Sequence, residues 1–268
     1  MAIDKVTGVA WTDLSKISSI TKANISKLSG HDAPSGSGSG SGGADIVFSD
    51  ITETTKDFSS NWSSSNPFPC ALPSSASSGD FVLILLATDI PLNGNYVNTP
   101  SGWTLREFVG TSTSDNSLHA YTRVLDGTEG SVVNITPTFN TRRGVLSFSM
   151  ICENIDTTNP FGTNTTVASS GSTMTVPSAT SSAAGTFIVF AGFDGADGEP
   201  ITMTNNGGFT LTFGGDLTVP TPAPSFGGHV TAEWQYAHIG ASTSTGTTSV
   251  SFATSDGHSG MHIMLQRA

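Results

Sequence analysis

The sequence is poor in charge, and basic residues are especially few. Of its 268 residues only 12% are charged, and 10 Lys or Arg stand against 21 Asp or Glu, which gives a formal net charge of −11. An acidic surface repels the phosphates of nucleic acids and the headgroups of anionic lipids. We therefore expect neither nucleic acid nor a membrane among the partners of this chain.

Long apolar runs and cysteines are also scarce. The longest apolar run, residues 81–87, is far shorter than the roughly 20 residues of a membrane-spanning helix. The N-terminal stretch MAIDKVTGVAWTD is too polar for an export signal, so we expect synthesis in a cytosol without export by a signal peptide. Cytosolic synthesis disfavours disulfides, which predicts that Cys70 and Cys152 are buried free thiols, with a pair between them as the alternative.

The first 34 residues carry regularly spaced apolar side chains, at steps of mostly three residues, that match neither a helix nor a strand. Alone, this segment would expose one apolar stripe to water, which monomeric proteins avoid. We interpret residues 1–34 as an anchor that docks onto sister chains or a particle surface; an N-terminal strand folded onto its own domain is the alternative. The residues expected to make the anchoring contacts are Val6, Val9, Trp11, Leu14, Ile17, Ile20, Ile25 and Leu28.

A pure Ser/Gly tract, residues 35–43, follows the anchor. Such a tract behaves as a random coil with a root-mean-square span of roughly 15–18 Å. An engineered joint is one explanation, but the segment before the tract does not look like a tag. We therefore interpret the tract as a native linker between the anchor and a domain at residues 44–268.

Residues 44–268 show the pattern of an all-β domain, with no predicted helix longer than a turn or two. The runs FVLILLATD at 81–89 and TFIVFAGFD at 186–194 are continuously apolar between turn residues, as buried central strands are. Turn clusters such as PLNGN, DGTEG and NNGG separate the strand patterns. Further strands are predicted at 117–125, 131–139, 143–155, 229–239, 248–254 and 260–268.

An internal repeat runs through this domain. The stretch LPSSASSGDFVLILLATD at 72–89 is similar to VPSATSSAAGTFIVFAGFD at 176–194, and PSGWTL at 100–105 is similar to NGGFTL at 206–211. The later strand patterns follow in the same order in both halves. We predict a jelly-roll-type β-sandwich in which two halves, about 72–155 and 176–268, share one core, with two separate tandem domains as the alternative.

Three motifs of the first half resemble a β-sandwich domain of tailed-phage and prophage structural proteins. They comprise Pro73, Gly79 and Asp80; Pro100, Gly102, Trp103 and Thr104; and Arg123, Asp126, Gly127, Thr128 and Glu129. The segment at 6–30 also resembles the N-terminal leader of structural proteins from marine phages. The resemblance covers most of the chain, and its motifs are structural rather than catalytic.

This resemblance implies a non-enzymatic component of the virion surface, either a tail fibre or appendage protein or a capsid decoration protein. It implies that residues 1–34 bind other virion proteins of the capsid or tail. By analogy with phage appendages, it also implies a homo-oligomer, with a trimer as the expected form.

The motif residues themselves predict structural roles. Trp103 directly follows a turn, where its indole can plug one end of the sandwich. Asp126 and Gly127 make a tight turn in which the Asp side chain caps local backbone amides. Arg123 and Glu129 flank that turn, and we expect them to form an ion pair across it.

The alternative function is a carbohydrate-binding module that recognises glycans on a host surface. Lectin-like sandwiches stack sugars on aromatic side chains in loops, and the candidates here are Trp62 and Tyr96, although each fits the role of a loop plug better. The polar loops expected at 56–70, 90–101 and 195–228 would surround such a site.

No residue pattern predicts catalysis, a metal or a cofactor. A G-x-S-x-G nucleophile motif is absent from the sequence. His258 and His262 would share one face of a strand near Asp256, but no zinc-type spacing accompanies them, and we expect surface or lumen-facing histidines. The acidic loop with Asp194, Asp197 and Glu199 is not a complete calcium motif.

Overall fold

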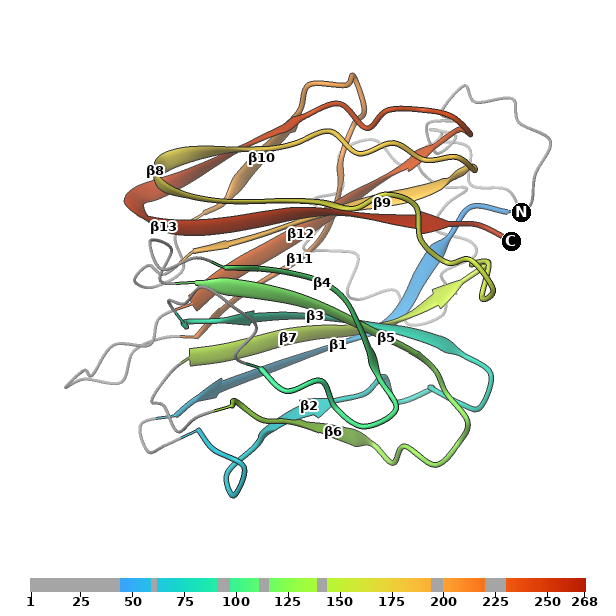
Figure 1. The fold of residues 1–268 in the computed structure, drawn as a ribbon, viewed down its shortest axis with the longest axis vertical. Helices are drawn as coiled ribbons and strands as arrows, with labels where there is room; N and C mark the ends of the chain where they lie inside the picture. The colour runs from blue at the N-terminus through green and yellow to red at the C-terminus, as the bar shows by residue number, and fades with distance from the viewer. Residues whose placement is uncertain are drawn as a thin grey trace, which may run out of the picture. The chain divides into compact units, whose positions relative to one another are not determined.

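The computed structural model describes seven stretches of the chain: residues 44–58, 62–90, 97–110, 116–138, 144–193, 200–219 and 230–268, without the side chains of residues 253–256. All of them belong to the second of the two units into which the chain divides, Ser39–Ala268. The predicted anchor at 1–34 and linker at 35–43 lie outside the described residues. Every regular element described is a β-strand, which confirms the all-β prediction (Figure 1).

The first half is built around a five-stranded antiparallel sheet. Its strand order is β1 (Val47–Asp57), β7 (Gly144–Glu153), β3 (Phe81–Thr88), β5 (Ser117–Val124) and β4 (Thr104–Gly110). A small second sheet pairs β2 (Phe68–Ala71) with β6 (Val132–Ile135). The chain passes repeatedly between the large and the small sheet, which is how a jelly roll is wrapped.

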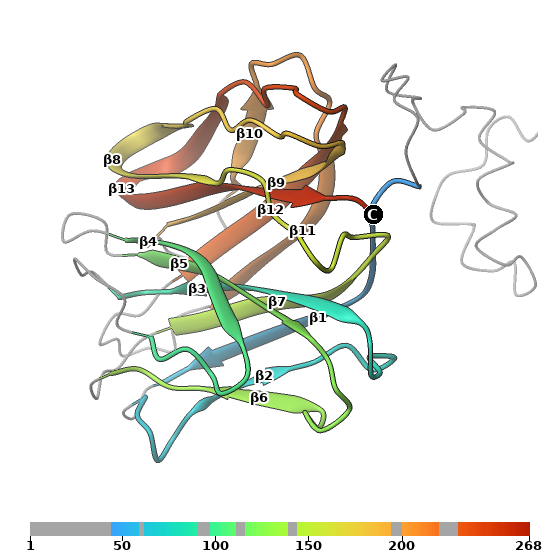
Figure 2. The same ribbon diagram turned by 45° about the vertical axis from the view of Figure 1, so that its right-hand side comes forward.

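The second half repeats this strand order. Its large sheet runs β8 (Thr165–Val176), β13 (Thr248–Gln266), β9 (Gly185–Phe193), β12 (Val230–Ile239) and β11 (Thr212–Val219), and β10 (Thr202–Asn205) pairs with the start of β13. Here β8 and β13 are long strands that bend together, and each takes the place of two strands in the first half (Figures 1 and 2). The sequence repeat is therefore a repeat of the fold.

The large sheets of the two halves pack face to face over a shared core. That core includes Leu85 and Phe148 from the first half and Phe190 and Trp234 from the second. The predicted shared core is confirmed. Since both large sheets are covered on both faces, β3 and β9 are buried at every position, which explains their continuous apolar sequences.

Each half also closes a core of its own, which the prediction of one simple sandwich did not include. In the first half, Ile84, Tyr121 and Ile135 belong to a cluster that joins the large sheet to the small one. In the second half, Phe187 and Val250 belong to the equivalent cluster inside the bend. The halves begin earlier than predicted, because β1 and β8 open them and not the repeated Pro-Ser stretches.

The two ends of the described chain meet at one end of the sheets. Asp45 lies just before β1, and its carboxylate is 2.7 Å from the guanidinium of Arg267, which follows β13. We call this the proximal end, and the opposite end the distal end. Within the described ranges, no helix is both long and apolar enough to cross a bilayer.

Candidate functional site

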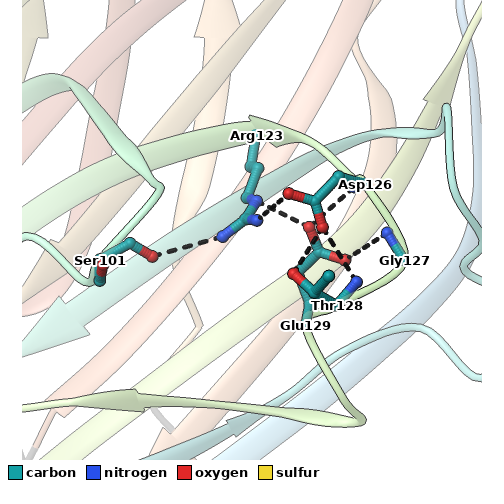
Figure 3. Close-up of polar contacts among 6 residues, drawn as sticks. All are labelled: Ser101, Arg123, Asp126, Gly127, Thr128 and Glu129. Atoms are coloured by element: carbon teal, nitrogen blue, oxygen red, sulfur yellow. Dashed lines mark hydrogen bonds and ion pairs between the residues drawn. The ribbon is translucent and has the colours of Figure 1, made fainter.

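A network of ion pairs closes the turn that follows β5 at the proximal end (Figure 3). Arg123 places Nε 2.7 Å from the carboxylate of Glu129 and a terminal nitrogen 2.9 Å from that of Asp126. Its other terminal nitrogen donates to the carbonyl of Ser101 at 3.3 Å. The predicted pairing of Arg123 with Glu129 is confirmed.

The two carboxylates of this network also bind the backbone of the turn. Glu129 accepts hydrogen bonds from the amides of Asp126 and Gly127, each at 2.9 Å. Asp126 accepts from the amide and the hydroxyl of Thr128, which confirms the predicted cap. These bonds, and then the smaller effect of Arg123, lower the pKa of the Asp126 carboxyl to about 2. The motif is thus a turn in which two carboxylates share one guanidinium and also bind the backbone amides.

Gly102 and Trp103 hold this turn against the rest of the first half. Gly102 has a φ of +79°, and a Cβ there would clash with the guanidinium of Arg123. The indole of Trp103 is 7% exposed and packs into the core of the first half, which confirms its predicted role as a plug.

A pocket of about 330 Å³ lies beside the turn. Its walls come from β4, β5, the turn itself and the segment after β7, and they include Thr104, Arg106, Thr122, Asp126 and Thr157. A second pocket, of about 480 Å³, lies where the segment after β7 meets the second half. Among the described residues, its lining consists of hydroxyl and amide side chains with Phe161 and Gly162, and none of these is charged. Charge therefore distinguishes the two pockets.

Arg106 enters the first pocket from a β-bulge. The register between β4 and β5 shifts between Leu105 and Glu107, so Arg106 is the extra residue of the bulge. Its Nε donates to the hydroxyl of Thr122 at 2.9 Å, and its guanidinium carbon lies 4.8 Å from the centre of the Phe161 ring. Sequence reasoning missed Arg106, because a bulge leaves no signature in the TLREF stretch.

Asp216 of β11 is the charged neighbour of two other carboxylates, Glu53 of β1 and Glu233 of β12. Asp216 and Glu233 are direct cross-strand partners, and Glu233 is only 6% exposed. Burial, followed by the charge of Asp216, raises the pKa of the carboxyls of Glu53 and Glu233. Close to this group, the indole Nε1 of Trp234 is buried without a hydrogen-bond partner. Glu233 itself lies on the face of β12 opposite the shared core, since its neighbours Ala232 and Trp234 belong to that core.

The structure does not support Trp62 as a glycan contact. Its side chain is completely buried, stacks on Phe58 and donates a hydrogen bond from Nε1 to the carbonyl of Ile135 at 3.1 Å. The apolar contacts of the first-half core outweigh exposure in the polar loop, so Trp62 is a plug. Tyr96 lies outside the described residues, and the expected loops at 56–70 and 195–228 contain β2, β10 and β11.

The paired histidines of β13 are core residues, so their predicted surface position is wrong. His258 and His262 are both fully buried. His258 stacks on Phe252, and His262 lies between the hydroxyls of Thr245 and Thr248. Burial lowers the pKa of His262 to about 4, so its ring is neutral at physiological pH.

Metal-binding side chains do not assemble in the part of the chain that the structure describes. There, no three His, Cys, Asp or Glu side chains come together in a way that could hold a metal ion. The acidic loop with Asp194, Asp197 and Glu199 lies outside that part.

Both cysteines are buried free thiols, as predicted. Cys70 lies beneath the small sheet and accepts a hydrogen bond from the hydroxyl of Ser147 at 3.3 Å, whereas Cys152 belongs to the shared core. Burial raises the pKa of the Cys70 thiol to about 12 and also raises that of Cys152.

Comparisons with known proteins add no relative to this description. No protein-family model, no curated protein and no solved structure matches the chain.

Proposed function

We propose that this chain is a non-enzymatic structural component of a tailed-phage virion. In this proposal residues 1–34 bind the capsid or tail, the Ser/Gly tract acts as a tether, and the duplicated jelly roll is displayed on the particle surface. The virion part of the proposal depends on the sequence motifs that resemble phage structural proteins. A homo-oligomer, with a trimer as its expected form, belongs to the same proposal.

The observation that carries the proposal is the position of the chain's entry into the domain. Asp45, the second described residue, pairs with Arg267 at the proximal end, and Asn154 donates a side-chain hydrogen bond to the carbonyl of Asp45 at 2.9 Å. The amide of Ala268 in turn donates to the carbonyl of Asn154 at 3.0 Å. A tether attached here holds the domain by its proximal end.

The pairing of the strands also determines which strand ends lie at the distal end of the domain. The strands β1, β3, β4, β9 and β11 all end at the distal end, as their pairing with antiparallel neighbours requires. Their last described residues therefore lie at the end opposite Asp45. A domain held at its proximal end presents its distal end to whatever the particle meets, which is the geometry expected of a displayed appendage.

The experiment compares particles assembled with the full chain and with residues 35–268. The shortened chain keeps every strand of the domain, so we expect it to fold with an unchanged unfolding temperature and to be missing from purified particles. Light scattering after size exclusion on both chains tests whether the first 34 residues also drive oligomerisation. Full occupancy of particles by the shortened chain would contradict the anchor.

A further inference from the structure

We propose that the pocket beside the Arg123 turn binds a small acidic sugar, with the sugar's carboxylate on the guanidinium of Arg106. This inference goes beyond the proposed display function and does not depend on it, since it concerns a pocket at the proximal end and not the anchor. It rests on three observations: the unused hydrogen-bond donors of Arg106, the ion pairs among the charged residues of the pocket, and the hydroxyl groups of the other lining residues.

Arg106 presents an open pair of donors. Its Nε is used by the hydroxyl of Thr122, while no ion pair or hydrogen bond to another described residue engages its two terminal nitrogens. The ring of Phe161 supports the plane of the guanidinium. A planar guanidinium held in this way binds a carboxylate through two parallel hydrogen bonds.

Of the two guanidiniums in the lining, Arg106 is the one available to an anionic ligand. Arg106 and Arg123 bring two positive charges to the pocket and Asp126 brings one negative charge. Arg123 is already bound to Asp126 and Glu129, so Arg106 is the guanidinium of the lining that is paired with no described carboxylate.

The remaining walls suit a polyol. The hydroxyls of Thr104, Thr122 and Thr157 and the carboxylate of Asp126 can exchange hydrogen bonds with sugar hydroxyls. Thr104 is the direct cross-strand partner of Thr122, so these two side chains stand on the same face of the sheet. Pro160 adds an apolar wall. A volume of about 330 Å³ lies at the lower end of the range for ligand pockets, which suits one sugar ring.

The test titrates the full chain with sodium D-glucuronate and follows binding by calorimetry and by chemical shifts of the β4 and β5 amides. We expect saturable binding that weakens as salt is added, because the guanidinium and carboxylate are screened at the pocket mouth. Methyl glucoside, which has the hydroxyls without the charge, should bind at least about tenfold more weakly. Sodium sulfate, which has the negative charge without the sugar hydroxyls, should displace glucuronate poorly.

Matched variants locate the site. Arg106→Gln should weaken glucuronate binding about tenfold or more, and Arg106→Lys should restore only part of it, because an ammonium lacks the planar pair of donors. Lys56→Gln removes the same charge from β1, where Lys56 lies outside the pocket lining, and should bind like wild type. An unchanged unfolding temperature checks that each variant is folded.

The possible results of the titrations lead to different conclusions about the pocket. Shifts confined to β4, β5 and the turn, together with loss in Arg106→Gln, support the site. Equal binding of sulfate and glucuronate would overturn the sugar assignment in favour of a simple anion site. Absence of saturable glucuronate binding, or equal binding by wild type and Arg106→Gln, would overturn the proposal altogether, whatever the particle experiment shows.

Discussion

Gly102 and Gly208 occupy matching turns of the two halves, and at both the backbone has a positive φ that favours glycine. Their surroundings differ. A Cβ at Gly102 would meet the guanidinium of Arg123, whereas a Cβ at Gly208 would meet nothing within 4 Å. Alanine variants at the two positions therefore separate the free-energy cost of backbone strain from that of disturbing the ion pairs of Arg123.

We expect Gly102→Ala to destabilise the domain by about 2–3 kcal/mol and Gly208→Ala by about 1 kcal/mol. The second variant carries only the left-handed backbone strain, and the first also displaces Arg123 from its carboxylate partners. Urea unfolding of both variants measures the difference. Equal losses would mean that the Arg123 network contributes nothing to stability.

Glu233 is buried directly opposite Asp216 in the large sheet of the second half. Its pKa in the folded protein is raised above the ordinary value of 4.5, chiefly by burial. A raised carboxyl pKa means that the folded state binds the proton more tightly than the unfolded state does. Its contribution to stability is therefore present below the ordinary pKa and is lost as the pH rises through the raised value.

We expect Glu233→Gln to stabilise the protein at neutral pH by about 1 kcal/mol, because the amide keeps an acceptor for Gln235 without the charge opposite Asp216. The gain should vanish in acid, where Glu233 is protonated in wild type as well. Unfolding free energies of both proteins across the acid range measure this difference. Glu53→Gln, at a more exposed carboxylate of the same group, should give a smaller gain, and a gain that persists in acid would refute the electrostatic explanation.

The small sheet of β2 and β6 is a short cover, with four residue pairs. A two-stranded pair of this length is marginally stable by itself and depends on the core beneath it. Cys70 lies in β2, whereas Cys152 lies in β7 within the shared core. The two thiols therefore report on different parts of the fold.

Neither thiol should react with a thiol reagent in the native protein, because both are buried and their raised pKa values keep them protonated. In low urea we expect Cys70 to become reactive before Cys152, as the small sheet opens locally. The single-thiol variants Cys152→Ala and Cys70→Ala measure each rate separately. Earlier labelling of Cys152 would show that the shared core is the weaker part.

Strand prediction from the sequence succeeded where both faces of a strand are covered. β3, β5, β7, β9 and β12 lie within a residue or two of their predicted bounds. The segments of β1, β8 and β11 gave no clear signal, because each is an edge strand whose Thr, Ser and Gly residues are partly exposed. The joining of two predicted strands into β13 was also missed, since the bend through residues 252–257 resembles a turn in sequence.

At the largest scale, the shared core joins the two halves of the domain. Phe148 of β7 makes edge contacts with Phe190 and Trp234 of the second half, at ring distances of 6.3 and 6.5 Å. These contacts link sheets that each have a core of their own. Loss of one of these aromatic contacts should therefore lower the stability of both halves.

We expect a single unfolding transition for the wild-type domain and for Phe148→Ala, with the variant less stable by about 3–5 kcal/mol. Val132→Ala, at an exposed position of β6, should change stability by less than about 0.5 kcal/mol. Calorimetry, together with hydrogen exchange of β5 and β12, distinguishes joint from separate unfolding. Two resolved transitions of which only one shifts would show that the halves unfold independently.

The sequence by itself determined the strand-rich composition, the duplication and the turn at Arg123, because periodicity and turn chemistry are local properties. Only the tertiary structure decided that Trp62 is buried, that His258 and His262 lie in the core, and that Arg106 faces a pocket from a bulge. Each of these depends on which distant strand covers a side chain. That information arises from packing between the two sheets and their covers and is absent from any short stretch of the chain.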